Sequence, residues 1–123
     1  MSNRVLVVEA EEDIRRLVSI KLKGAGYEVA TANDGEEGLA AAVRDKPDLL
    51  VSDVMMPKKD GLTVAAELKA DPDTAGIPVV LLSAKAQAGD LGAGMATGAD
   101  DYITKPFDPL ELLDRVIALI EGT

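Results

Sequence analysis

The chain has 123 residues, of which 47% are hydrophobic and only 2% are aromatic, and it contains no cysteine. A core of this composition must be built from aliphatic side chains, and neither a disulfide framework nor a thiolate metal site is possible. The formal net charge of −9 disfavours binding to nucleic acid or to an anionic membrane, and favours a divalent cation or a basic protein surface. The sequence shows neither an apolar run long enough to span a bilayer nor a secretory leader, so we expect a cytoplasmic protein without membrane contact.

Short β-branched runs alternate with longer helical patterns five times, and no linker rich in Pro, Gly or Ser divides them. We therefore expect one domain over residues 1–123. The predicted strands cover residues 4–8, 27–31, 49–52, 77–82 and 102–104. The predicted helices cover residues 12–23, 62–70, 87–96 and 109–120, together with a helix that Asn33 or Asp34 caps and that ends near residue 45. Strands joined by helical crossovers predict an α/β fold with a doubly wound parallel sheet.

Hydrophobic spacing predicts which side of each helix faces the core. The expected inner faces carry Ile14, Leu17, Val18 and Leu22 in the first helix, and Leu39, Ala42 and Val43 in the second. The third strand is apolar on both sides, as expected of a central strand that helices cover on each face.

The predicted fourth helix is rich in glycine. Gly89, Gly92, Gly94 and Gly98 lie in or beside it. Each glycine in a helix interior costs about 1 kcal/mol relative to alanine. We therefore expect this helix to be locally mobile.

Functional groups are expected at the carboxyl ends of the strands, where doubly wound sheets bind their ligands. The residues just past these ends are Glu9, Ala10, Glu11 and Glu12 after the first strand, Asp53 after the third, Ser83 after the fourth and Lys105 after the fifth. Any one of them could be a turn residue, a helix cap or a surface lysine. A carboxylate, a hydroxyl and an ammonium together form a set that can handle a phosphoryl group, so we expect this edge to be functional.

Four segments along the chain carry a more specific signal. They read VLVVEAEEDIRRL, PDLLVSDVMMPKKDGL, PVVLLSAKA and GADDYITKPF. In order and spacing they resemble the signature segments of the response-regulator receiver family, and the match covers essentially the whole chain. The resemblance implies two-component signal transduction, a flavodoxin-like sheet of five parallel strands in the order 2-1-3-4-5, and five helices. It also implies a cis peptide bond between Lys105 and Pro106.

The resemblance assigns roles to individual residues. It makes Asp53 the phosphorylated aspartate, Ser83 the switch hydroxyl and Lys105 the ammonium that pairs with the phosphoryl group. Tyr102 would rotate inward on activation, and Met55 would give its backbone carbonyl to a magnesium ion. The implied partners are a sensor histidine kinase or phosphotransfer protein, and a downstream protein or output domain on the face of the fourth helix, fifth strand and fifth helix.

One position departs from the family pattern. Receivers usually carry two adjacent acids after the first strand, the second of which is a direct magnesium ligand, and here Glu9 and Ala10 occupy these positions. Ala10 cannot bind metal, and magnesium keeps waters where ligands are missing. We therefore expect a weak site formed by Glu9, Asp53 and the Met55 carbonyl. Glu9 could reach inward to compensate, and Glu11 is a further candidate whose simpler explanation is the dipole at the start of the first helix.

Ala10 also keeps a second function open, a receiver-fold module that signals by protein interaction without phosphorylation. The retained acceptor, hydroxyl, aromatic and ammonium side chains favour phosphorylation. A phosphatase with an Asp nucleophile is disfavoured because Met55 stands where it needs a second acid. A flavin protein is disfavoured because the acids after the first strand would repel its phosphate.

Overall fold

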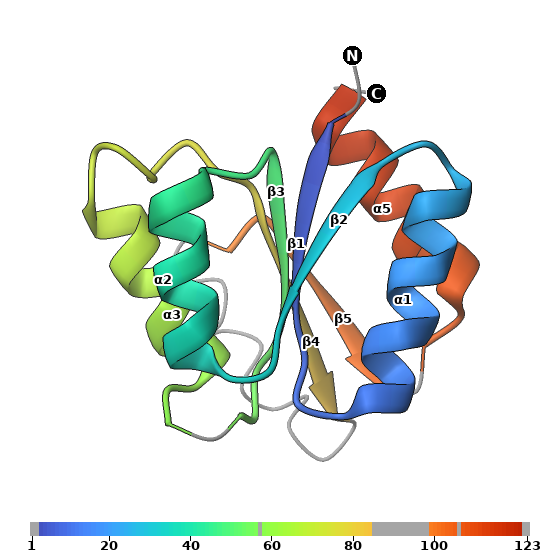
Figure 1. Cartoon of the computed structure of the whole chain (residues 1–123), viewed down its shortest axis with the longest axis horizontal. Coiled ribbons are helices and arrows are strands. Elements are labelled where there is room, and N and C mark those ends of the chain that lie inside the picture. Colours follow the sequence, from blue (N-terminus) through green and yellow to red (C-terminus); the bar gives the residue numbers. More distant parts are fainter. Residues whose placement is uncertain (1–2, 57, 85–98, 106, 122–123) are drawn as a thin grey trace.

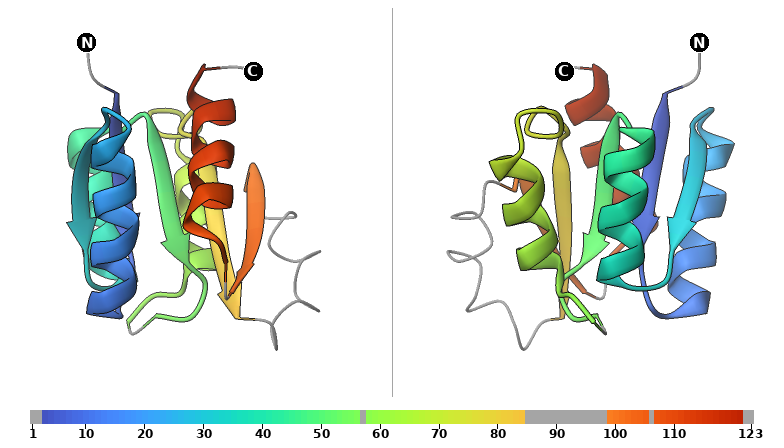
Figure 2. Two further views of the ribbon diagram at one scale, coloured as in Figure 1. Left: turned by 90° about the vertical axis from the view of Figure 1, so that its right-hand side faces the viewer. Right: turned by 60° about the vertical axis from the view of Figure 1, so that its left-hand side comes forward.

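The computed structural model describes residues 3–56, 58–84, 99–105 and 107–121. Five strands form one sheet in the order β2-β1-β3-β4-β5 (Figure 1). Their bounds are β1 Arg4–Val8, β2 Glu28–Ala32, β3 Leu49–Asp53, β4 Val79–Ala84 and β5 Asp101–Lys105. All neighbouring strands are parallel, so the strand arrows point to the same end of the molecule (Figure 2).

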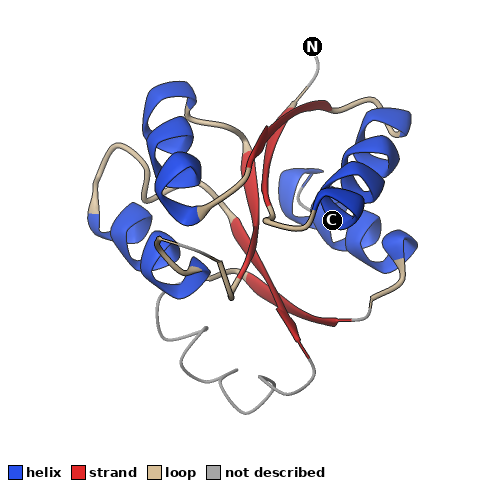
Figure 3. Cartoon of the chain, turned by 60° about the horizontal axis from the view of Figure 1, so that its bottom comes forward, coloured by secondary structure: helices blue, strands red, loops and turns tan. Residues whose placement is uncertain are grey.

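The described helices are α1 Glu12–Gly24, α2 Gly35–Asp45, α3 Gly61–Ala70 and α5 Pro109–Glu121. Helices α1 and α5 cover one face of the sheet, and α2 and α3 cover the other (Figures 1 and 3). The predicted doubly wound α/β fold and its strand order are confirmed. The predicted fourth helix at residues 87–96 lies outside the described residues, as does its predicted mobility.

The sheet separates two aliphatic cores. Along β1, Leu6 and Val8 pack on the side of α2 and α3, whereas Val5 and Val7 pack on the side of α1 and α5. Every residue of β3 is buried, as predicted for a central strand that helices cover on both faces. The carboxyl ends of β1 and β3 therefore meet near the middle of the sheet edge, flanked by helices on both sides.

The buried helix faces differ from the prediction at two positions. Leu17 is 44% exposed and Val43 is 46% exposed, so neither belongs to the core. On α1 the predicted Val18 and Leu22 are buried, together with Ser19. On α2 the helix meets the sheet through small residues, because a Cβ on Gly38 would lie 2.7 Å from Val8 Cγ2. This close approach turns the small-residue side of α2 inward and Val43 outward.

Four strands, β2 to β5, extend further than predicted at their carboxyl ends, and three of them thereby include a candidate residue. β3 includes Asp53, β4 includes Ser83 and β5 includes Lys105, residues that were expected just past the strands. All three residues are paired along the sheet, Asp53 with Leu82, Ser83 with Thr104 and Lys105 with Ala84. The sheet, rather than a loop, therefore fixes the backbone of each candidate.

Candidate functional site

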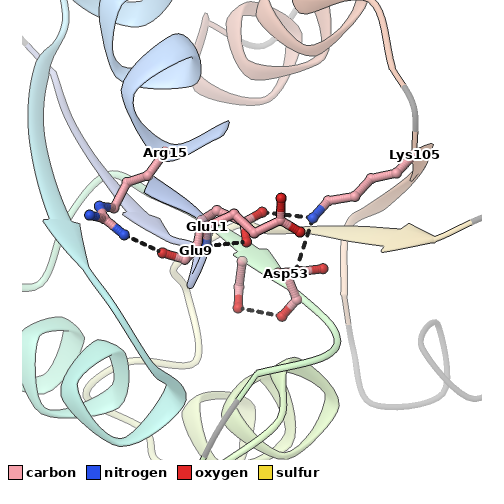
Figure 4. Close-up of polar contacts among 6 residues, drawn as sticks. Glu9, Glu11, Arg15, Asp53 and Lys105 are labelled. Atoms are coloured by element: carbon pink, nitrogen blue, oxygen red, sulfur yellow. Dashed lines mark hydrogen bonds and ion pairs between the residues drawn. The ribbon is translucent and has the colours of Figure 1, made fainter. Parts of the chain in front are cut away.

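An ion-pair cluster of Glu9, Asp53 and Lys105 lies at the carboxyl edge of the sheet (Figure 4). The Lys105 Nζ atom donates to Glu9 Oε1 at 2.7 Å and to Asp53 Oδ2 at 3.0 Å. Glu9 is fully buried, and Asp53 is only 7% exposed. Three residues from distant parts of the sequence are thus in direct contact, with one ammonium shared by two carboxylates.

The strand order explains how these residues meet. Glu9 directly follows β1, which pairs with β3 so that Val8 lies opposite Ser52. Glu9 follows Val8 and Asp53 follows Ser52, so Glu9 and Asp53 lie side by side on neighbouring parts of the sheet edge. Lys105 ends β5, and β4 lies between β5 and β3. Only a long side chain can reach both carboxylates across that intervening strand, and lysine is long enough to do so.

The turn after β1 holds Glu9 from several sides. The Glu9 N–H donates to the Ala32 carbonyl at 3.1 Å, and Arg15 Nη1 donates to the Glu9 carbonyl at 2.9 Å. The Glu11 N–H donates to Glu9 Oε2 at 3.2 Å (Figure 4). Since Lys105 bonds the other oxygen, both oxygens of the Glu9 carboxylate have a donor. Its orientation is therefore fixed by the turn as well as by the ion pair.

The start of α3 packs against the backbone of Asp53. The Val54 N–H donates to the Leu82 carbonyl at 2.8 Å, and the Gly61 N–H donates to the Val54 carbonyl at 2.9 Å. A Cβ on Gly61 would collide with the Asp53 carbonyl oxygen. Only glycine fits there without a shift of the backbone, so Gly61 sets how closely α3 approaches Asp53.

Arg15 and Gly61 were not singled out by the sequence analysis. Arg15 belongs to the early part of α1, where the helix dipole favours acids, so a basic residue there is a weak signal of a specific contact. Gly61 directly follows Asp60, whose side chain accepts from the Thr63 N–H at 2.7 Å and caps α3. A glycine at the first position of a capped helix is the signal that could have indicated a close approach.

The environment of the cluster raises the pKa of Asp53 to about 6. Burial is the largest cause and the Glu9 carboxylate adds to it, whereas the hydrogen bond from Lys105 acts in the opposite direction. Burial alone would lower the pKa of Lys105, but its bonds to both carboxylates outweigh that effect and raise it. At neutral pH Lys105 is therefore charged and Asp53 is mostly ionised, which is the form that a nucleophilic carboxylate needs.

Two further predicted residues lie on the strands beside the cluster. Ser83 is fully buried on β4, between the strands that end in Asp53 and Lys105. The Tyr102 ring, on β5, packs against the core on the side of α2 and α3. Its hydroxyl oxygen is buried and has no hydrogen-bond partner among the described residues. Pro106, and with it the predicted cis peptide bond, lies outside the described residues.

The cluster offers fewer acids than a three-carboxylate metal site. Within the ranges that the structure describes, no group of three or more acidic, His or Cys side chains is placed to hold a metal ion. Ala10 is exposed and brings no side-chain ligand. Mg²⁺ is commonly held by one or two carboxylates together with phosphate oxygens and water. The Glu9 and Asp53 carboxylates, with the Met55 carbonyl as the predicted backbone donor, therefore fit such a cation as a partial set of ligands.

Known proteins resemble this chain along nearly its whole length. A family model described as the response regulator receiver domain matches residues 5–117. The chain is 49% identical over 120 residues to RpaA of Synechocystis, a DNA-binding dual master transcriptional regulator, covering 98% of this chain and 50% of RpaA. It is 50% identical over 119 residues to the response regulator PleD of Caulobacter vibrioides, covering 97% of this chain and 26% of PleD. The chain thus spans about half of RpaA and about a quarter of PleD.

Solved structures show the same fold. A putative response regulator from Chloroflexus aurantiacus superimposes with a TM-score of 0.93 at 35% identity, covering 98% of this chain and 99% of the other. The chemotaxis response regulator CheY4 of Vibrio cholerae superimposes with a TM-score of 0.90 at 34% identity, covering 97% of this chain and 99% of the other. In the described part of the chain, no helix is long and apolar enough to cross a membrane.

The family match extends over both cores and the whole ion-pair cluster. Receivers of this family are generally signalling modules rather than enzymes; they interact with histidine kinases, are phosphorylated on an aspartate and generally use Mg²⁺ for that step. With a family model over residues 5–117 and two full-length structural matches, this chain belongs to the response regulator receiver domain family of two-component signalling.

Proposed function

We propose that this receiver accepts a phosphoryl group on Asp53 from a sensor histidine kinase or a phosphotransfer protein. The observation that carries the proposal is the 3.0 Å contact between the nearly buried Asp53 carboxylate and the Lys105 ammonium. An ammonium in this place can stabilise phosphoryl oxygens as they approach the carboxylate, and burial strengthens that interaction. Other aspartates in the described part of the chain also pair with Lys or Arg, but their side chains are more exposed than that of Asp53.

In the transfer, a carboxylate oxygen of Asp53 attacks the phosphorus atom of the donor. The bond from phosphorus to the donor atom breaks, the donor keeps the electron pair, and an acyl phosphate forms on Asp53. Lys105 donates to the phosphoryl oxygens, while its 2.7 Å bond to Glu9 holds the ammonium in position. A divalent cation held by Glu9, Asp53 and the Met55 carbonyl would neutralise further charge on those oxygens.

The proposed output passes through Ser83 and Tyr102. Ser83 lies on the strand between the acceptor and the ammonium, so its hydroxyl can move toward the phosphoryl group. The Tyr102 hydroxyl has no partner among the described residues, so a change in its packing breaks no hydrogen bond there. The partner, a downstream protein or an attached output domain, would bind the face of the predicted fourth helix, β5 and α5.

We also propose that residues 1–123 form one receiver domain of a cytoplasmic protein, and that this domain turns over no substrate. The net charge of −9 supports the further proposal that it binds neither nucleic acid nor a membrane directly. DNA binding is ascribed to RpaA, of which the chain spans 50%, so any such output would belong to a segment outside the matched region.

A phosphorylation-independent interaction module is the weaker alternative. It depends on Ala10, which removes one magnesium ligand. Burial of the Glu9 and Asp53 carboxylates costs desolvation free energy, and a pure docking module would gain nothing from it. The cluster is thus better explained by a chemical role.

Labelling with acetyl phosphate and magnesium tests the proposed function. Intact-mass spectrometry should show one added phosphoryl mass, and peptide mapping should place it on Asp53. No added mass under conditions that label a reference receiver, or a label on a different acid, would contradict the proposal.

A further inference from the structure

The ion-pair cluster contains two carboxylates and one ammonium. Lys105 Nζ is within hydrogen-bond distance of both Glu9 and Asp53, and the described residues place no third acid with them. With both carboxylates ionised, the cluster carries one net negative charge. Glu9 is fully buried and Asp53 nearly so, which means that water screens this charge poorly.

A divalent cation suits the resting and phosphorylated clusters differently. In the resting protein it would convert one net negative charge into one net positive charge. In the acyl phosphate, the Asp53 carboxylate charge is replaced by about two negative charges on the phosphoryl oxygens. With Glu9 and Lys105 unchanged, the cluster then carries about two net negative charges, which a divalent cation neutralises.

The oxygen ligands that are free to bind a cation also favour the phosphorylated state. In the resting protein both carboxylates already bond Lys105, and Glu9 Oε2 also accepts from the Glu11 N–H. A cation must therefore compete with an ammonium that is always present at the site. A phosphoryl group adds oxygens of the kind that Mg²⁺ takes from substrates beside one or two carboxylates.

We propose that this chain binds its divalent cation chiefly in the phosphorylated state, because the phosphoryl group supplies the charge and the oxygen ligands that Ala10 does not. The inference rests on the proposed role of Asp53 as acceptor and adds a strong coupling between cation and phosphoryl group. Coupling free energies are reciprocal, so the cation strengthens binding of a phosphoryl mimic by the same factor that the mimic strengthens binding of the cation.

Beryllofluoride, a phosphoryl mimic, makes this coupling measurable without enzymatic turnover. Its affinity is obtained by ¹⁹F NMR in excess EDTA and in saturating Mg²⁺ at one ionic strength, with fluoride alone as the blank. Mg²⁺ binding to the resting protein is measured separately by calorimetry. We expect weak resting Mg²⁺ binding and a gain in beryllofluoride affinity of about 100-fold, toward the upper end of common couplings.

Two substitutions at one position separate charge from ligand number. Ala10→Asp adds a carboxylate, so resting Mg²⁺ affinity should rise on the order of tenfold and the coupling to beryllofluoride should fall. Ala10→Asn adds an oxygen ligand of similar size without charge, so it should lower the coupling less than Ala10→Asp does. Both changes are at an exposed position, which keeps the fold intact.

The outcomes distinguish the inference from the proposed function. A parent that binds Mg²⁺ at rest as tightly as Ala10→Asp, or a coupling that is equal in the two proteins, overturns the inference while Asp53 remains the acceptor. A parent that binds no beryllofluoride at any Mg²⁺ concentration overturns both. A coupling that is largest in the parent, intermediate in Ala10→Asn and smallest in Ala10→Asp supports the inference.

Discussion

Lys105 and Glu9 are 96 positions apart in the sequence, yet the Lys105 ammonium lies 2.7 Å from the fully buried Glu9 carboxylate. This contact is shorter than the 3.0 Å contact between the same ammonium and Asp53. Glu9 is therefore both the anchor of the ammonium and a source of negative charge beside the proposed acceptor. Its substitution should change the chemistry of Asp53 directly.

Glu9→Gln should lower the pKa of Asp53 below the parent value of about 6, because one of the charges that raise it is removed. Carbon-detected NMR titration of the Asp53 carboxyl measures this value. Glu12→Gln is the matched control, since Glu12 is an exposed acid that pairs with Arg16. An Asp53 pKa that is equal in both variants would show that Glu9 does not influence the acceptor.

The raised pKa of Asp53 predicts a pH dependence of stability. The folded protein favours the protonated form of Asp53 more than the unfolded chain does. The contribution of this group to the free energy of unfolding is therefore fully present below the ordinary pKa of 3.8 and is lost as pH rises through about 6. Asp53→Asn should remove this loss and be more stable than the parent at pH 7 by about 1–3 kcal/mol.

Urea unfolding in EDTA, between pH 4 and pH 7.5, measures the effect. The exposed Asp114 supplies the control variant, Asp114→Asn. A stability difference between Asp53→Asn and the parent that does not grow over this pH range would contradict the assignment of a raised pKa.

Gly61→Ala should destabilise the protein by about 1–3 kcal/mol and slow labelling, because its Cβ collides with the Asp53 backbone. Gly24→Ala is the control, since a Cβ there meets no atom within 4 Å and alanine favours the helix. Thermal unfolding and acetyl phosphate labelling should separate the two variants. Equal behaviour would mean that the close approach of α3 to Asp53 has no consequence.

The two tyrosines should respond in opposite ways to loss of the hydroxyl. Tyr102→Phe removes a buried hydroxyl without a partner among the described residues and should stabilise the resting protein by about 1 kcal/mol. Tyr27→Phe removes a 3.1 Å hydrogen bond to Glu121 and should destabilise it by a similar amount. Thermal unfolding of both variants decides this; a destabilised Tyr102→Phe would indicate that the hydroxyl is paired.

Much of the fold could be predicted from local patterns. The alternation of β-branched and helical segments predicted the parallel α/β sheet, and the apolar third strand predicted its central place, because burial on both faces leaves a direct mark on composition. The buried faces of the helices were harder to predict from the sequence. Gly38 lets α2 approach Val8 so closely that Val43 turns outward. Hydrophobic spacing alone does not predict this, because glycine has no side chain that would mark it as a core position.

The site was predictable as a set of residue types but not as a geometry. The ends of the strands brought Asp53 and Lys105 to one edge, as the pattern of polar residues after strands indicated. The closer pairing of Lys105 with Glu9 was not foreseen, because it depends on the length of two side chains and on donors from Glu11 and Arg15 in the turn. Such contacts exist only once the turn is folded.

The most direct test of the central claim is intact-mass spectrometry of Asp53→Asn and Asp114→Asn after incubation with acetyl phosphate and magnesium. Both variants remove one carboxylate, but only Asp53 lies against Lys105. Asp114→Asn should gain one phosphoryl mass at the rate of the parent, and Asp53→Asn should gain none. Labelling of Asp53→Asn as strong as that of the parent would contradict the assignment of Asp53 as the acceptor.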